Sequence, residues 1–359
     1  MDKLMRRFYV GVLVLSVSCG TRPDTSENKE EDPTKDTAAY PSAVIPLAGW
    51  DITLGNGKVV EALDGFSHDN FFYTVNDGED WVVFKSPNRG VTTKNSHNTR
   101  SELKQEGADE KGEDQPGDIR WTPSKGGKLT GTLKVMNVST SGDPRVAAAY
   151  SVVVGQIHSG EGHKNEPLKI FYKKYPGHTK GSVFWNYEIN TEGSNAARWD
   201  LATAVWGYDW SVLGTSSETY PDEPTDGIAL GEEFSYEINV HDGIMYLRFE
   251  SDGHETRTFV KSLVDSEFTD RASLPDQIEQ LFVPIGREGV EKADAYKGEK
   301  QFFAQGAYNQ ANGDDPDNNR VWSTGSETFN GDIQQQYANG SYAEVWFKKS
   351  SVGPGTAPE

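Results

Sequence analysis

KLTGTLKV, at residues 128–135, places an apolar or small residue at every second position. That period of two is typical of a β-strand with one buried face. Similar short segments lie on both sides of it, and turn-forming pairs such as Asn56-Gly57 and Asp242-Gly243 separate them. We expect strands at 50–54, 80–84, 147–154, 184–189, 234–240 and 244–249. This spacing predicts an all-β protein built as an antiparallel sandwich or barrel.

The composition agrees with one β domain and excludes several other classes. Aromatic residues make up 11% of the 359 residues, and no internal linker interrupts the strand pattern, so we expect a single domain at 41–348 with short helices only at 262–268 and 274–281. No apolar run approaches ~20 residues and no heptad pattern is sustained, which excludes a membrane-spanning bundle and a coiled coil. The formal net charge of −20 argues against nucleic acid and anionic membranes as partners.

The N-terminal residues have the features of an export signal. Basic residues occur within the first seven positions, an apolar segment follows at 8–17, and the single cysteine, Cys19, comes after small residues. The pattern resembles a bacterial lipoprotein signal, in which the cysteine becomes the lipidated first residue. We therefore expect a signal peptide at 1–18 and an outer-membrane or cell-surface lipoprotein whose only membrane contact is a lipid on Cys19. The alternative is an ordinary cleaved signal and a secreted protein.

Two terminal segments have too few apolar residues to build a core. Residues 19–40 are rich in Thr, Ser, Pro, Asp, Glu and Lys, which predicts a flexible acidic tether between the anchor and the folded domain. The last residues, 349–359, are expected to form a disordered tail. The one cysteine also excludes a scaffold held together by disulfides.

Three segments carry side chains suited to chemistry. They are NSHNTRSELK at 95–104, QIH at 156–158 and FFAQGAYNQ at 302–310. On strands, Arg100, Glu102 and Lys104 share one face, as do Gln156 and His158, and as do Tyr308 and Gln310. Each pattern alone also fits an ordinary solvated strand face or a strand end.

Taken together, in this order, the three segments resemble the signature strands of the polysaccharide lyase family 7 alginate lyases. That family has Arg-Ser/Thr-Glu-Leu-Arg, Gln-Ile/Val-His and Tyr-Phe-Lys-Ala-Gly-x-Tyr-Asn-Gln. The opening WDITL at 50–54 and the Pro-x-x-Gly-x-Thr-Thr pattern at 87–93 are also similar. The resemblance covers most of 41–348. It implies a β-jelly-roll of two antiparallel sheets, one of them concave and holding an anionic polysaccharide, alginate. It implies cleavage of 1,4-linked uronate chains by β-elimination, with no metal and no cofactor.

The resemblance also assigns roles to four residues. Arg100 and Gln156 would neutralise the uronate carboxylate, so that the developing enolate is stabilised. His158 would accept the C5 proton, since an imidazole is neutral near pH 7. Tyr308 would protonate the leaving O4, and for the epimer whose C5 proton lies on the other side it would also be the base.

Substrate binding is expected of Glu102, Lys104, Lys169 and Gln310, with Lys173, Lys174 and Lys180 as further candidates for the groove. The sequence departs from the family pattern at Phe302 and Ala304, where the family has Tyr and Lys, and at Lys104, where it has Arg. Residues 314–319 resemble a calcium loop only superficially, because Arg320 stands where such a loop needs glycine.

The sequence also bears on two alternative functions, on the preferred uronate blocks and on the mode of cleavage. A non-catalytic glycan-binding lipoprotein would keep the groove without needing both His158 and Tyr308. A jelly-roll glycoside hydrolase would need paired carboxylates, and no Glu-x-Asp-x-x-Glu strand occurs. In the family, Ile157 goes with guluronate-containing substrates, so we favour guluronate or mixed blocks. The long segments 191–232 and 261–300 are expected to close one end of the groove and make cleavage exolytic, or else to be surface decoration. We expect a monomer.

Overall fold

The computed structural model describes residues 38–358 apart from 95, 106–118, 161–164 and 193–194. The expected signal peptide, Cys19 and most of the expected tether lie outside these residues. Within the described part, no helix combines the length and apolar character of a membrane span. Ala38, the first described residue, already contacts the domain, because its carbonyl accepts a hydrogen bond from the Thr74 hydroxyl.

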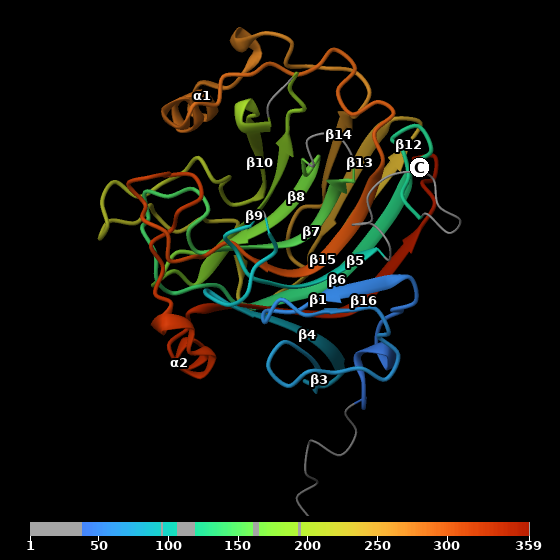
Figure 1. Ribbon diagram of the computed structural model, residues 1–359, viewed down its shortest axis with the longest axis vertical. Helices are drawn as coiled ribbons and strands as arrows, with labels where there is room; N and C mark the ends of the chain where they lie inside the picture. Colours follow the sequence, from blue (N-terminus) through green and yellow to red (C-terminus); the bar gives the residue numbers. More distant parts are fainter. Residues whose placement is uncertain (1–37, 95, 106–118, 161–164, 193–194, 359) are drawn as a thin grey trace, which may run out of the picture. The chain divides into compact units, whose positions relative to one another are not determined.

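Two antiparallel sheets form the domain (Figure 1). The first of them carries the cavity described below. Its strand order is β10 (Asp200–Trp206), β9 (Lys180–Glu188), β8 (Leu168–Lys173), β7 (Ser151–Ser159), β15 (Gln301–Asn309), β5 (Arg100–Gln105), β1 (Trp50–Thr53) and β2 (Val59–Val60), with β11 (Ile228–Ala229) paired to β9.

The second sheet packs against the first. Its order is β14 (Arg257–Ser262), β13 (Ile244–Glu250), β12 (Glu233–His241), β6 (Gly127–Asn137), β16 (Tyr342–Gly353), β4 (Asp80–Pro87) and β3 (Phe72–Asn76). The helices are short: α1 (Asp276–Phe282), α2 (Ile333–Ala338) and 3-10 turns at Pro41–Ala43, Asn195–Ala197, Arg271–Ser273, Val283–Ile285 and Phe329–Gly331. The prediction of an all-β jelly-roll sandwich with few helices is confirmed.

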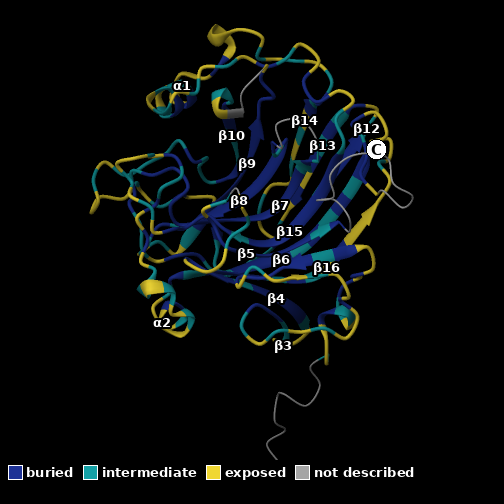
Figure 2. Ribbon diagram, viewed as in Figure 1, coloured by how far each residue is buried: buried dark blue, intermediate teal, exposed yellow. Residues whose placement is uncertain are grey.

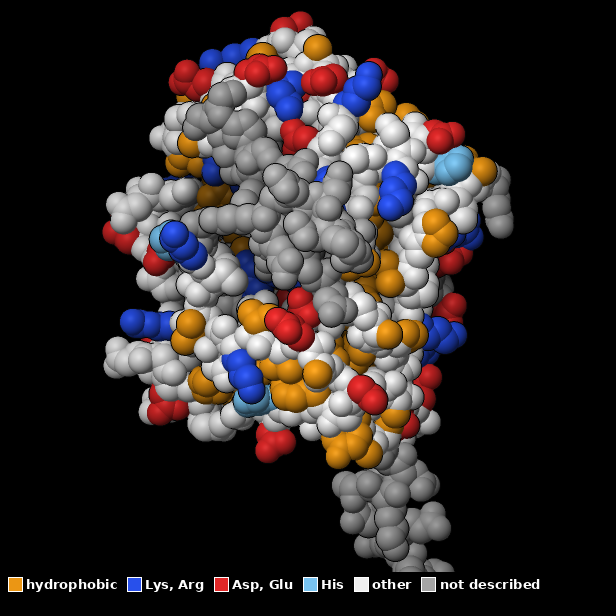
Figure 3. Space-filling view, turned by 45° about the vertical axis from the view of Figure 1, so that its right-hand side comes forward, with side chains coloured by type: hydrophobic (Ala, Val, Ile, Leu, Met, Phe, Trp, Pro, Cys, Tyr) orange, Lys and Arg blue, Asp and Glu red, His pale blue; other side chains and the backbone are white. Residues whose placement is uncertain are grey.

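The core lies between the sheets and follows the alternation seen in the sequence. Along β6, Leu129, Gly131 and Leu133 are buried, while Thr130 and Thr132 between them are partly exposed. Figure 2 shows the strands of both sheets mostly in the colour of buried residues. Gly131 occupies an inward position because a Cβ there would lie 2.8 Å from the ring of Tyr236. The face of the molecule in Figure 3 shows acidic and basic side chains interspersed, without one large patch of either sign.

The same alternation positions the functional side chains. Leu103 of β5 and Ile157 of β7 are fully buried in the core. Because successive strand residues point to opposite faces, their neighbours Glu102, Gln156 and His158 point away from the core, toward the cavity side of the first sheet.

A bulge in β15 sets the position of Tyr308. The register against β7 shifts between Gln305 and Tyr308, whereas the pairing with β5 stays regular and places Tyr308 opposite Arg100. Gly306 lies within the bulge at φ +143°, and a Cβ there would come within 2.5 Å of the Ser101 carbonyl oxygen. The bulge therefore requires glycine, and it re-aims the strand just before the tyrosine.

The segments 191–232 and 261–300 meet at the β10 edge of the first sheet. The backbone N–H of Gly289 donates to the Ala197 carbonyl at 2.7 Å, and the Trp199 indole donates to the Gly289 carbonyl. Helix α1, from the second segment, lies beside the end of β10, from the first (Figure 1).

The structure corrects two local expectations. The helix expected at 274–281 is confirmed as α1, but none forms at 262–268, where the Ser262 hydroxyl instead accepts turn hydrogen bonds from the N–H groups of Val264 and Asp265. The expected disordered tail is also wrong, because β16 continues to Gly353 and Thr356 exchanges hydrogen bonds with Asn239. Backbone pairing with β6, rather than apolar burial, orders this end of the chain.

Candidate active site

A cavity of about 940 Å³ lies over the middle strands of the first sheet. Strands contribute Arg100, Lys104, His158, Lys169 and Tyr308 to its lining, and loops contribute Ser96, Glu166, Arg198, Arg287, Gln310 and Trp322. The three sequence motifs thus meet in one place, because β7, β15 and β5 are neighbours in the sheet.

Arg100 is held from below by a buried carboxylate. Its Nη1 lies 2.9 Å from Glu102 Oε2, and the other carboxylate oxygen accepts a 2.7 Å hydrogen bond from Gln156 Nε2. Glu102 and Gln156 are each 1% exposed. Glu102 was expected to bind substrate, but the structure places it beneath the cavity, where it orients Arg100 and Gln156.

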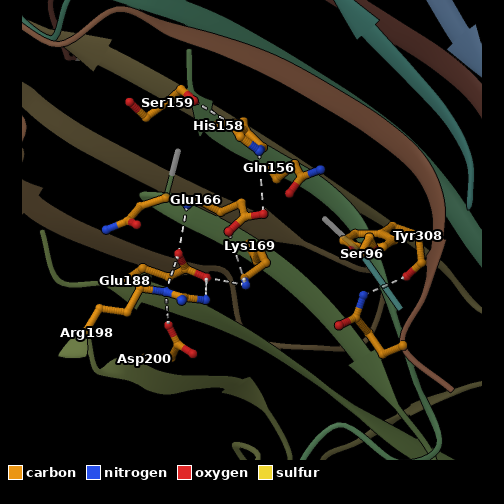
Figure 4. A network of polar contacts seen from close by, with 12 residues as sticks. Ser96, Gln156, His158, Ser159, Glu166, Lys169, Glu188, Arg198, Asp200 and Tyr308 are labelled. Atoms are coloured by element: carbon orange, nitrogen blue, oxygen red, sulfur yellow. Dashed lines mark hydrogen bonds and ion pairs between the residues drawn. The ribbon is translucent and has the colours of Figure 1, made fainter. Parts of the chain in front are cut away.

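Tyr308 stacks on Arg100 and turns its hydroxyl toward a loop serine. The guanidinium carbon of Arg100 lies 3.8 Å from the centre of the Tyr308 ring. Tyr308 Oη lies 3.1 Å from Ser96 Oγ, and Figure 4 shows the two residues side by side. Burial alone would lower the pKa of Arg100, but the neighbouring Tyr308 and Glu102 raise it above its ordinary value. Arg100 therefore stays a cation next to the phenol.

The ring of His158 is fixed in both plane and tautomer. It stacks on Phe302 with ring centres 4.9 Å apart and planes at 15°. Its Nδ1 lies 2.7 Å from the Ser159 carbonyl oxygen, which can only accept, so Nδ1 carries the hydrogen (Figure 4). In the neutral ring, Nε2 then holds the lone pair that can accept a proton.

We call Arg100, Gln156, His158 and Tyr308, the four residues expected from the sequence to be catalytic, the catalytic cluster. Of the residues expected to bind substrate, Lys104, Lys169 and Gln310 line the cavity. Gln310 Nε2 also donates to the backbone carbonyl of Tyr308 at 3.2 Å. The further lysine candidates lie elsewhere: Lys173, Lys174 and Lys180 direct their ammonium groups to the carbonyls of Ala147, His178 and Thr225, respectively.

A second group of charges, buried or half-buried, adjoins the catalytic cluster. We call Glu166, Lys169, Glu188, Arg198 and Asp200 the ionic cluster (Figure 4). Arg198 Nε and Nη2 lie 2.8 and 3.1 Å from the two carboxylate oxygens of Glu188, which also accepts from Lys169. Arg198 Nε lies 3.3 Å from Asp200 as well.

Burial and the neighbouring charges give the acids of the ionic cluster different pKa values. Burial would raise the pKa of Glu188, but Arg198 and Lys169 hold it below its ordinary value. Burial, followed by the repulsion of Glu188, raises the pKa of Glu166 to about 7. Burial likewise raises the pKa of Asp200 to about 6.

Sequence reasoning missed most of the ionic cluster. Glu188 and Asp200 lie on neighbouring strands, directly opposite each other in the β9–β10 pairing. Arg198 precedes β10, and only Lys169 was singled out in advance. The one available signal was charge within otherwise apolar strand segments, since an acid in such a place needs a partner when buried.

The geometry defines a class of protein: a jelly-roll with the catalytic cluster on one sheet, beside a cavity of about 940 Å³. The sequence model of the family described as alginate lyase matches residues 45–354. The chain therefore belongs to the alginate lyase family.

Individual relatives agree with this assignment. An alginate lyase from Klebsiella pneumoniae is 26% identical over 317 residues, 79% of this chain and 89% of the relative. The crystal structure of an exolytic PL7 alginate lyase from Zobellia galactanivorans superposes with a TM-score of 0.85 at 60% identity, covering 89% of this chain and 99% of the other. The crystal structure of the Klebsiella pneumoniae enzyme, at 20% identity, has the same fold with a TM-score of 0.58 over 88% of this chain and 99% of its own.

Proposed function

We propose that this alginate lyase removes short unsaturated units from chain ends by β-elimination, with His158 as base and Tyr308 as acid. The observation that carries the chemistry is the tautomer of His158, whose Nδ1 is committed to the Ser159 carbonyl. Nε2 is therefore the proton acceptor on the cavity side. Arg100 lies next to Tyr308 and supplies positive charge where the substrate carboxylate and the developing enolate need it.

The elimination balances within the substrate and two side chains. The C5–H bond breaks as the Nε2–H bond of His158 forms. The C5 electron pair becomes the C4=C5 double bond, and the C4–O4 bond breaks. Tyr308 gives its hydroxyl proton to O4, and water restores that proton afterwards. For the opposite epimer at C5, Tyr308 serves as both base and acid.

The exolytic mode is supported by how the cavity ends. Arg198 and Arg287 come from the two long segments 191–232 and 261–300, and both line the cavity on its β10 side. Arg287 Nη1 lies 3.4 Å from the Arg198 carbonyl oxygen, so the two segments touch there. A groove closed in this way admits a chain end rather than the middle of a polymer. The structural relative at 60% identity is described as exolytic.

The block preference remains guluronate or mixed sequences. Ile157 is fully buried in the core, so it acts on specificity only through the position of His158. Export with a lipid on Cys19 also belongs to the proposal, and it rests on residues 1–19 alone. Replacing Cys19 with serine should release the protein from membranes of the producing cell; continued membrane association would contradict the lipid anchor.

Viscosity measured alongside ultraviolet absorbance tests the function and the mode together. Elimination creates a conjugated uronate that absorbs, whereas a glycan-binding protein produces no absorbance change. We expect absorbance to rise while viscosity falls slowly, because terminal cuts shorten chains little. An early collapse of viscosity with long oligomers would contradict exolysis and leave the lyase activity intact.

Arg287→Ala sharpens this test. Loss of one charged contact at the closed end should raise KM for oligouronates about tenfold. Arg271→Ala is the matched control, since Arg271 lies in the same segment and pairs with Glu279 on the surface. Equal KM values in the two variants would contradict a binding role for Arg287.

A further inference from the structure

Glu166 places a carboxyl group beside the reactive nitrogen of the proposed base. It lies in the loop between β7 and β8, and its Oε1 is 3.6 Å from Nε2 of His158. The side chains of Glu166 and His158 are 18% and 20% exposed, so both reach the cavity surface. Neither the family motifs nor the proposed elimination uses this acid.

The acid is held in place from two further sides. The backbone N–H of Glu166 donates to Glu188 Oε2 at 2.9 Å, and its Oε2 lies 3.7 Å from Lys169 Nζ. The ring of His158 is fixed by Phe302 and by the Ser159 carbonyl. Carboxyl and imidazole are therefore oriented independently of each other, and they meet at Nε2, the nitrogen that must take the proton.

We propose that Glu166 is a positioning residue that receives from His158 the proton removed from the substrate. The inference rests on the proposed function, in which His158 is the base. After elimination, the Nε2–H bond breaks and an O–H bond forms on Oε1 of Glu166. His158 returns to its neutral tautomer, and Glu166 gives the proton to water at the cavity surface.

The surrounding charges suit an acid that exchanges protons near neutrality. The groups that face Glu166 from the packed elements are Arg100 of β5, His158 of β7, Lys169 of β8, Glu188 of β9, and Arg198 and Arg287 from the two long segments. Burial, followed by repulsion from Glu188, raises the pKa of Glu166 to about 7 against the opposing effect of Lys169 and Arg198. A proton acceptor works best when its pKa is near the working pH.

Three variants test the relay. Glu166→Gln keeps the shape but cannot accept a proton, so kcat should fall about tenfold, less than the ~10²-fold expected for the base itself. Glu166→Asp retains a carboxylate at a greater distance and should lose only part of that rate. The matched control is Glu299→Gln, because Glu299 accepts a hydrogen bond from the Ser159 hydroxyl but has no recorded contact with His158 among the described residues.

The pH profile separates this role from a structural one. A carboxylate next to His158 favours the protonated ring, so Glu166→Gln should move the acidic limb of kcat/KM to lower pH. Glu299→Gln should leave the limb in place. In a His158→Ala background, Glu166→Gln should cause no further loss, since Glu166 acts through His158.

An unchanged kcat and an unchanged acidic limb of kcat/KM in Glu166→Gln would overturn the relay. An equal shift of that limb in Glu299→Gln would overturn it as well. So would a further loss of activity when Glu166→Gln is added to His158→Ala. If Glu166→Gln does not fold, Glu166→Asp decides, because wild-type kcat and limb in that variant would also overturn it. Absence of ultraviolet product from the wild-type protein would instead contradict the proposed function.

Discussion

The catalytic cluster and the ionic cluster place buried charge on the same sheet in opposite ways. In the ionic cluster, the guanidinium of Arg198 contacts both oxygens of Glu188 and one oxygen of Asp200. In the catalytic cluster, Arg100 contacts one oxygen of Glu102, and its buried Nε has no hydrogen-bond partner among the described residues. In the ionic cluster, the carboxylate of Glu188 is neutralised by two cations of the protein, Arg198 and Lys169. Arg100 lines the cavity instead, where its guanidinium can contact a substrate.

The largest expected effect is on activity, in the catalytic cluster. Tyr308→Phe and His158→Ala should each lower kcat by at least ~10²-fold, because each removes a proton-transfer group. Both variants should melt close to the wild-type temperature, since neither residue carries the core. Turnover is measured by absorbance on guluronate, mannuronate and mixed blocks. Near wild-type turnover by Tyr308→Phe on every block would refute the mechanism.

The ionic cluster should respond in stability instead. Glu188→Gln leaves Lys169 and Arg198 buried beside a neutral amide, and loss of one partner of a buried ion pair typically costs about 3–5 kcal/mol. Urea unfolding measures this change. Glu237→Gln is the control, because the pair of Glu237 with Lys128 is partly exposed and should cost at most about 1 kcal/mol. Equal losses in the two variants would remove the distinction between the clusters.

The smallest expected effect concerns two buried lysines of β8. Lys169 contacts Glu188, whereas the ammonium of Lys173 donates to the Ala147 carbonyl, and burial lowers the pKa of Lys173 to about 7. The unfolded chain, in which a lysine has its ordinary higher pKa, therefore binds more protons between pH 7 and about 10. The free energy of unfolding of the wild-type protein should therefore increase as the pH rises through that window, because of Lys173.

Lys173→Met should abolish that gain and be at least as stable as the wild type near pH 6. Melting temperatures of both proteins between pH 6 and 10 measure it. Curves that stay parallel across the window would show that Lys173 is solvated or paired in the folded state.

The comparison also shows which parts of the site were predictable. Arg100, His158 and Tyr308 lie on strands whose alternation is visible in the sequence, so their shared orientation could be predicted. Glu102 has the same alternation, yet it lies beneath the cavity, because its carboxylate is shared by Arg100 and Gln156. The period-two pattern of a strand predicts the face to which a side chain points, but it does not predict which neighbouring residue that side chain contacts.

The predictions for the chain end and for residues 262–268 were wrong for a related reason. Residues 349–353 contain only one large apolar residue, Val352, and so have no apolar face that would predict a strand. Backbone hydrogen bonds to β6 do not depend on such a face. At 262–268, local hydrogen bonds of the Ser262 hydroxyl compete with helix formation.

The residue pattern was sufficient for the all-β architecture, the family and the shared orientation of Arg100, His158 and Tyr308, because period-two burial and short strand motifs are local properties. Tertiary structure alone brought Glu166 to His158, joined Arg198 to Glu188, and brought together beside the cavity two segments about ninety residues apart, as the hydrogen bond from Arg287 to Arg198 shows. These contacts depend on strand order and loop packing. The partner of a buried charge is then decided by which element the fold places against it.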